Sequence, residues 1–162
     1  KLHDSIENEF KGLDALIHCA SILGPKVPLA HYPPDAWAEV MMTNANSVFL
    51  LNQGLFDLLD AGERSCVIHV SSTVGRKARA YWGAYAVSKF AVEGLMQVLA
   101  DEYEGRVKFN TFNPGPTRTK MRALALPGEN PYTIPSAENV ASKIISCINN
   151  KNLKHGESIK IK

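Results

Sequence analysis

The sequence predicts an α/β protein in which a parallel sheet is covered by helices. Two short segments, Leu13–Cys19 and Cys66–Ser71, are almost continuously apolar, which is typical of strands buried on both faces. Longer amphipathic segments alternate with them, and a hydrophobic content of 45% with 21% charged residues is that of a globular protein. We therefore expect one domain over residues 1–162.

The first half of the chain predicts a helix, a strand, a loop and a second helix. Residues 1–11 resemble the end of a helix, and the strand at 13–19 follows. Residues 23–34 contain four prolines and predict a loop. A long helix is then expected from Asp35 to Leu59, since Asp35 follows two prolines and favours a helix N-terminus.

The second half repeats this alternation after a turn at residues 60–63. The strand at 66–71 precedes an amphipathic helix at 84–103, and residues 106–112 alternate as a strand does. Proline, glycine and asparagine at 124–135 predict a mobile flap over a substrate. Ser136 is expected to cap a helix that runs to Ile148, and residues 156–161 predict a final strand.

Composition excludes several classes of partner. A net charge of +2 gives no reason to expect nucleic acid or an anionic membrane. No apolar run approaches the ~20 residues of a membrane span, and the first residues do not resemble a signal peptide. Cys19, Cys66 and Cys147 are few and distant, so reduced thiols in the cytoplasm are expected. His18 has no metal-ligand spacing, which predicts a core histidine and no metal site.

A tyrosine, a lysine and a serine carry the chemistry. Tyr85 and Lys89 are four residues apart and share one face of the predicted helix. A nearby ammonium is expected to lower the phenol pKa from about 10 toward the range useful for acid–base catalysis. Ser72 follows a buried strand, and its hydroxyl can hold a carbonyl or alcohol oxygen. These groups suit ketone–alcohol interconversion, for which a cofactor must supply the hydride.

Each of these residues also has a simpler interpretation. A Tyr-x-x-x-Lys pair alone is usually a solvated helix face, and Ser71 competes with Ser72 for the role of the hydroxyl. Asn44 in mid-helix can be a satisfied core polar group. The basic residues at 76–79 can form a solvated loop or meet an anionic substrate. Cys19 can be a reactive thiol, but no charge near it in sequence supports this.

The combined motifs resemble the short-chain dehydrogenase/reductase family over essentially the whole chain. That family carries an Asn-Ser-Tyr-Lys tetrad, which falls on Asn44, Ser72, Tyr85 and Lys89. The resemblance implies that Tyr85 is the general acid/base, that Lys89 lowers its pKa and binds ribose hydroxyls, and that Ser72 orients the reacting oxygen. Asn44 is implied to hold a water in a proton relay.

Two further segments resemble cofactor-binding loops of the family. Cys19, Ala20 and Ser21 stand where the family usually has Asn-Ala-Gly, in a turn under the adenosine ribose. The segment Asn113–Thr119 resembles the Pro-Gly loop that meets the nicotinamide. Besides Tyr85 and Lys89, the implied cofactor-binding residues are therefore Cys19, Ala20, Ser21, Pro114, Gly115, Thr117 and Thr119.

The resemblance also implies the fold, the cofactor and the partners. We expect the C-terminal part of a doubly wound Rossmann-type α/β/α sheet that lacks the first βαβ units, because no glycine-rich dinucleotide turn precedes Leu13. The cofactor is NADP or NAD, with a slight preference for NADP, and the substrate is a small carbonyl compound or alcohol. A homodimer or homotetramer through helices 35–59 and 84–103 is expected. The alternative is an inactive remnant that only dimerises.

Overall fold

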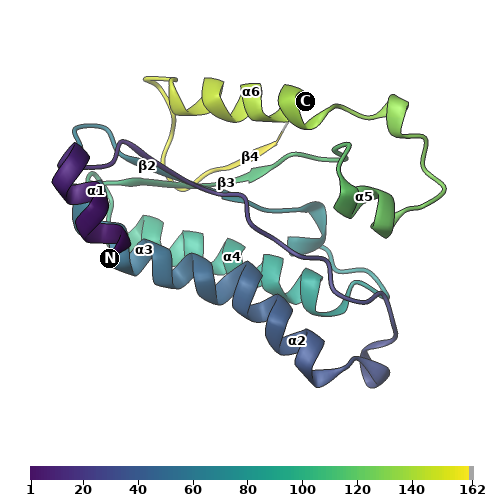
Figure 1. Cartoon of the computed structure of the whole chain (residues 1–162). Helices are drawn as coiled ribbons and strands as arrows, with labels where there is room; N and C mark the ends of the chain where they lie inside the picture. Colours follow the sequence, from purple (N-terminus) through teal and green to yellow (C-terminus); the bar gives the residue numbers. More distant parts are fainter. Residues whose placement is uncertain (161–162) are drawn as a thin grey trace.

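The computed structural model describes residues 1–160, which fold around one sheet of four parallel strands (Figure 1). The strands lie in the order β1-β2-β3-β4, and they comprise β1 (Ala15–His18), β2 (Cys66–Val70), β3 (Lys108–Asn113) and β4 (Ser158–Lys160). The helices are α1 (Leu2–Phe10), α2 (Pro34–Met41), α3 (Ser47–Asp60), α4 (Gly83–Glu102), α5 (Lys120–Ala125) and α6 (Ala137–Ile148). The predicted α/β class with a parallel sheet is confirmed.

Helices cover both faces of the sheet. In Figure 1, α3 and α4 lie side by side below the strands, and α6 lies above them. Val67 and Phe109 point to the α3–α4 side and pack with Leu59 and Met96. The α6 side is formed by a second cluster comprising Ile68, Phe112, Val140 and Ile144. Alternate residues of the central strands thus enter two separate apolar layers, as the nearly continuous hydrophobic run at 66–71 predicts.

The long helix predicted from Asp35 to Leu59 is divided. It begins at Pro34, a favourable first helical residue, and the α-helix ends at Met41. A π-helical turn, η2 (Met42–Asn46), follows before α3 continues to Asp60. The irregular turn contains Asn44, whose amide bonds a loop outside the helix, so a tertiary contact accompanies the break in the α-helical pattern.

Strand β1 has one open edge. Among residues 1–160 it pairs with β2 alone, from Ala15 opposite Cys66 to His18 opposite His69. Its predicted length, Leu13–Cys19, is shortened at both ends. The last strand is also shorter than the predicted 156–161, and Ile161 lies outside the described residues.

His18 is a core residue, as predicted. It is buried, and its Nε2 lies 3.2 Å from Oδ1 of Asn52 on α3. Nδ2 of the same asparagine lies 3.0 Å from Nε2 of His69, a fully buried residue of β2. The two histidines and the asparagine therefore form a polar network beneath the sheet.

The segment predicted to be a flap contains more regular structure than expected. Leu124 and Ala125 belong to α5, and a 3₁₀ turn, η4, covers Pro131–Thr133. Arg122 and Glu129 form a two-bond ion pair across the intervening turn. Ser136 caps α6 as predicted, because its Oγ accepts a bond from the Asn139 amide at 3.3 Å. No helix in residues 1–160 is long and apolar enough to cross a membrane.

Candidate active site

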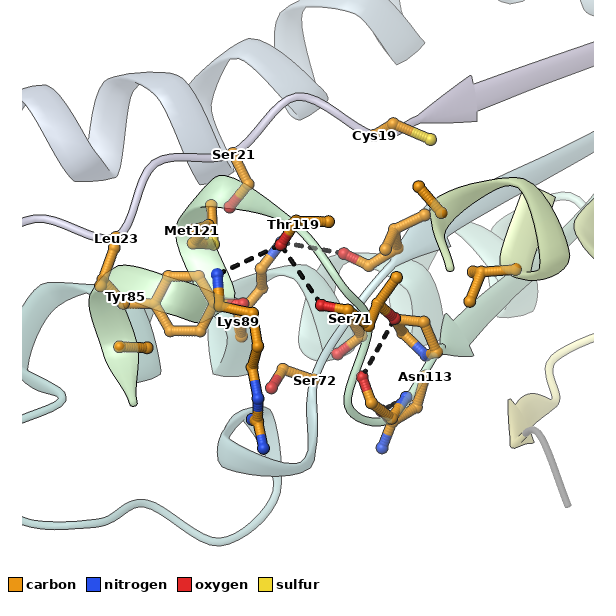
Figure 2. A pocket seen from close by; sticks show the side chains of 18 of the residues that line it. Cys19, Ser21, Leu23, Ser71, Ser72, Tyr85, Lys89, Asn113, Thr119 and Met121 are labelled. Atoms are coloured by element: carbon orange, nitrogen blue, oxygen red, sulfur yellow. Dashed lines mark hydrogen bonds between the residues drawn. The ribbon is translucent and has the colours of Figure 1, made fainter. Parts of the chain in front are cut away.

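A pocket lies at the carboxyl ends of the strands, where open α/β sheets bind ligands. Its volume is about 370 Å³, within the usual range for small-molecule sites. Six segments line it (Figure 2), namely the turn after β1, the loop after β2, the first turns of α4, the loop after β3, and helices α5 and α6. Ser72, Tyr85 and Lys89 all border this one pocket.

Ser72 lies just beyond the end of β2. Extended backbone at this residue precedes a 3₁₀ turn, η3 (Thr73–Gly75), and the Ser72 side chain caps it by accepting a 3.4 Å bond from the Val74 amide. The hydroxyl also bonds the Tyr85 side chain, which acts to lower the pKa of the phenol. The strand end and the cap together direct Ser72 toward Tyr85.

Tyr85 lies in the first turn of α4 and is only 8% exposed. Its ring packs among Leu23, Trp82 and Met121, with 5.8 Å between the centroids of Tyr85 and Trp82. Burial raises the pKa of Tyr85 above its ordinary value, and the bond from Ser72 only opposes this shift. The expectation that the lysine would lower this pKa is therefore wrong for the chain as described.

The contacts of Lys89 explain that difference. Its Nζ donates a 2.9 Å bond to the Val70 carbonyl and lies 5.6 Å from the centroid of the Tyr85 ring. Burial lowers the pKa of the lysine itself to about 8, which Cys19 opposes weakly. Lys89 thus has a reduced preference for the charged form, and its ammonium is directed to the backbone of β2.

Asn44 lies behind the pocket and does not line it. Its Oδ1 accepts a 2.8 Å bond from the Ile22 amide, and its Nδ2 donates to the Ile22 carbonyl at 2.9 Å and to Ser88 Oγ at 3.1 Å. The side chain is 1% exposed and has all these partners within the protein. The Asn44 amide is therefore a buried polar group whose hydrogen bonds are satisfied within the protein. Its role in a proton relay stays a prediction.

The loop after β3 borders the pocket through Pro114, Gly115, Thr117 and Thr119. Gly115 has a left-handed φ of +66°, and a Cβ built there would meet no atom within 4 Å. Asn113 fixes the loop, since its Oδ1 accepts from the Gly115 amide and its Nδ2 donates to Thr73 Oγ1. The Pro-Gly loop is thereby linked to the turn that carries Ser72.

Thr119 already has a structural role. Its Oγ1 accepts a 3.1 Å bond from the Arg122 amide and caps the short helix α5. Thr117 is more weakly held, with 3.4 Å between its Oγ1 and the Gly115 carbonyl oxygen. Thr117 therefore has the freer hydroxyl for a ligand.

The turn after β1 reaches the pocket only in part. Cys19 and Ser21 line it, whereas Ala20 is not among the lining residues. Cys19 is exposed, but desolvation raises the pKa of its thiol while Lys89 opposes the shift, which does not favour a reactive thiolate.

Two buried hydroxyls in this pocket have no partner. Ser21 Oγ and Ser71 Oγ are both inaccessible and make no hydrogen bond in the structure. Such groups usually have partners, so the pocket fits a polar ligand such as a ribose or carboxamide of a dinucleotide. From the sequence alone, Ser71 is only a rival of Ser72 for the catalytic hydroxyl. Its position directly after β2, next to Ser72, is the feature from which a second hydroxyl at this pocket could have been predicted.

In the basic loop at residues 76–79, at least one positive charge does not face the pocket. Arg76 points away and pairs with Glu93, while Trp82 contributes to the wall beside Tyr85. Tyr81 is exposed with a left-handed φ of +70°. In residues 1–160 no three His, Cys, Asp or Glu side chains are grouped closely enough to hold a metal ion.

Comparison with known proteins gives a consistent result. A family model described as short chain dehydrogenase matches residues 1–130. The uncharacterized oxidoreductase YciK of Escherichia coli K12 is 44% identical over 140 residues, which cover 86% of this chain and 56% of YciK. The chain therefore spans little more than half of the length of that relative.

Solved structures of similar proteins superpose closely. A short-chain dehydrogenase from Shigella flexneri, complexed with NADP, matches with a TM-score of 0.94 and 40% identity, over 98% of this chain and 67% of that chain. A second, from Pseudomonas syringae, matches with a TM-score of 0.93 and 45% identity, over 98% and 66% respectively. The sheet and its helices are thus found within larger proteins of one family.

Proposed function

Since this chain belongs to the short-chain dehydrogenase family, we propose that it forms the catalytic part of an NAD(P)-dependent oxidoreductase acting on carbonyl compounds and secondary alcohols. One observation carries the proposal. A phenol, a serine hydroxyl and a lysine, predicted from their spacing, border one pocket that also contains two unpartnered hydroxyls.

In this proposal Tyr85 donates a proton to the carbonyl oxygen during reduction. Burial raises the pKa of this phenol, so it is protonated at neutral pH and has a proton to give, although the same shift makes it a weaker acid than a free tyrosine. Ser72, bonded to the same phenol, orients the substrate oxygen, and Lys89 would meet the ribose hydroxyls of the cofactor. Asn44 supports this arrangement through Ser88, between Tyr85 and Lys89 on α4. A bound nicotinamide supplies or accepts the hydride.

Several residues would hold the dinucleotide. We assign this role to the turn after β1 and to the Pro-Gly loop, where Ser21, Gly115 and Thr117 face the pocket. Ser71 is added to this set because its hydroxyl is buried without a partner. NADP is the preferred form, and the complex of the similar Shigella flexneri protein with NADP supports this choice.

The test is a Tyr85→Phe variant. It removes the proton donor and keeps the ring, so we expect turnover of a carbonyl substrate to fall by roughly 10²-fold or more. The dissociation constant for NADPH, measured by fluorescence titration, should change less than twofold. Tyr132→Phe is the matched control, because Tyr132 is 85% exposed and does not line the pocket. Retained turnover in Tyr85→Phe would refute Tyr85 as the proton donor.

A second candidate role is association with another copy of this chain. Helices α3 and α4 lie side by side below the sheet (Figure 1), and both carry exposed large apolar side chains, which include Phe49 (47% exposed), Leu50, Phe90 (44% exposed) and Val98. A face of this kind on two neighbouring helices favours a helix-to-helix contact between copies. This role does not require catalysis, so it also applies if the chain is an inactive remnant.

Sedimentation velocity tests this association. A Phe49→Glu, Phe90→Glu double variant should shift the chain from dimer or tetramer to monomer. Ile145→Glu is the control, since Ile145 is 52% exposed but lies on α6 at the opposite face of the sheet. An unchanged oligomeric state in the double variant, or a monomeric parent chain, would refute the contact.

A further inference from the structure

A buried carboxylate links the loop that carries Ser72 to the helix that carries Tyr85 and Lys89. Glu93 lies on α4, one helical turn after Lys89, and is only 7% exposed. Arg76 follows Ser72 by four residues, and its Nη2 lies 3.4 Å and 3.3 Å from the two carboxylate oxygens of Glu93. One guanidinium nitrogen thus contacts both carboxylate oxygens, and the ion pair joins the loop to the helix.

A residue of the sheet also bonds the carboxylate of Glu93. Thr111 of β3 is fully buried, and its Oγ1 donates a 3.1 Å bond to Oε2 of Glu93. Oγ of Ser158 on β4 lies 2.8 Å from the same threonine oxygen, so the serine hydroxyl can donate a hydrogen bond to it. Glu93 is thus bonded to β3 through Thr111, and that threonine is in turn bonded to β4, independently of Arg76.

The turn between Ser72 and Arg76 is in direct contact with α4. A Cβ at Gly75 would lie 2.9 Å from both the Cβ and the carbonyl oxygen of Lys89. Only a residue without a side chain permits this approach, so η3 lies against the backbone of Lys89. The ion pair of Arg76 and Glu93 closes the loop one turn further along the same helix.

We propose that Glu93 is a positioning residue, which through Arg76 holds the Ser72 loop against α4 and so sets the Ser72 hydroxyl beside the Tyr85 phenol. This inference rests on the proposed function for its catalytic consequence. Its structural part does not, because the restraint acts on residues 72–77 whether or not the chain turns over a substrate. Among residues 1–160, Arg76 is the one cation within ion-pair distance of Glu93, and its other side-chain bond is a longer one of 3.5 Å to Thr111 Oγ1.

A double-mutant cycle tests the catalytic part. Glu93→Gln keeps an oxygen for Thr111 but removes the charge that holds Arg76, so we expect kcat to fall by about 10- to 100-fold with a nearly unchanged KM. In a Ser72→Ala background the same substitution should change kcat by less than twofold, since the hydroxyl that it positions is absent. Equal losses in both backgrounds would show general damage and overturn the proposal.

Hydrogen exchange tests the structural part without activity. The amides of Gly75, Arg76 and Lys77 bond the carbonyls of Ser72 and Thr73 at 3.0 to 3.2 Å. In Glu93→Gln these amides should exchange at least tenfold faster, while those of β2 stay unchanged. Glu102→Gln, an exposed change on the same helix, is the control and should have no effect.

Two further variants keep the test decisive. Arg76→Met breaks the link from its more exposed end and should reproduce the faster exchange if Glu93→Gln folds poorly. Arg76→Lys, which retains a charge, should restore part of the protection. A chain without turnover would refute the proposed function, and the exchange rates would then decide the positioning role alone. Unchanged exchange in both Glu93→Gln and Arg76→Met would overturn it.

Discussion

The buried pair of histidines predicts an acid-sensitive fold. Nε2 of His69 faces the amide nitrogen of Asn52 at 3.0 Å, so it accepts a bond and has no room for a proton of its own. Nδ1 then carries the proton, and it has no partner. Burial, with smaller contributions from His18 and Lys89, lowers the pKa of His69 to about 3.

The sign of the pH effect follows from this direction. The folded pKa lies below the ordinary value of about 6.5, so the unfolded chain binds the proton first and stability falls as the pH drops below about 6.5. Between these two pKa values, each unit of pH decrease lowers the free energy of unfolding by about 1.4 kcal/mol. His69 alone therefore removes about 2 kcal/mol between pH 6.5 and pH 5.

Urea unfolding at pH 7 and pH 5 measures this loss. Over this interval the free energy of unfolding should fall by about 2 kcal/mol more in the parent chain than in a His69→Gln variant, because glutamine does not titrate. If that variant does not fold, the imidazole NMR signal of His69 in the parent chain provides the same information. It should stay neutral down to pH 5 in the folded protein and titrate near 6.5 in urea. A folded-state titration above pH 6 would refute the reasoning.

Two further predictions concern packing around the site. Gly75→Ala should destabilise the fold by about 1–3 kcal/mol, because the new Cβ would overlap the backbone of Lys89. Gly94→Ala is the control, since a Cβ at this position of α4 meets no atom within 4 Å, and it should increase stability by up to about 1 kcal/mol. Asn44→Ala should cost about 2 kcal/mol by leaving the amide and carbonyl of Ile22 unpaired. Urea titration measures all three, and a neutral Gly75→Ala or Asn44→Ala would contradict these packing arguments.

The candidate catalytic residues were predictable because their signals are local. Tyr85 and Lys89 are one helical turn apart, and Ser72 follows a buried strand, so periodicity alone places them on known element types. That all three share a pocket depends on the parallel register of the central strands. The resemblance to a family implied that the three residues act together, but no register was predicted from the sequence.

The electrostatics of these residues were not predictable in the same way. Spacing suggested that Lys89 would lower the pKa of Tyr85, but its Nζ bonds the Val70 carbonyl and burial raises the phenol pKa instead. Desolvation depends on Trp82, which precedes the same helix, and on Leu23 and Met121, which come from two distant segments. A charge effect read from sequence separation therefore missed the larger effect of burial.

The sequence by itself determined the element types, the parallel sheet and the candidate catalytic residues, since hydrophobic period and short-range spacing are properties of neighbouring residues. Only the tertiary structure decided the π turn at Asn44, the network of His18 with His69, and the pairing of Arg76 with Glu93. Arg76 and Glu93 are 17 positions apart, and His18 and His69 are 51 positions apart. The π turn accompanies the bonds of Asn44 to Ile22, in another segment. Polar groups buried by the fold find their partners across the core, and no local pattern encodes which partner that will be.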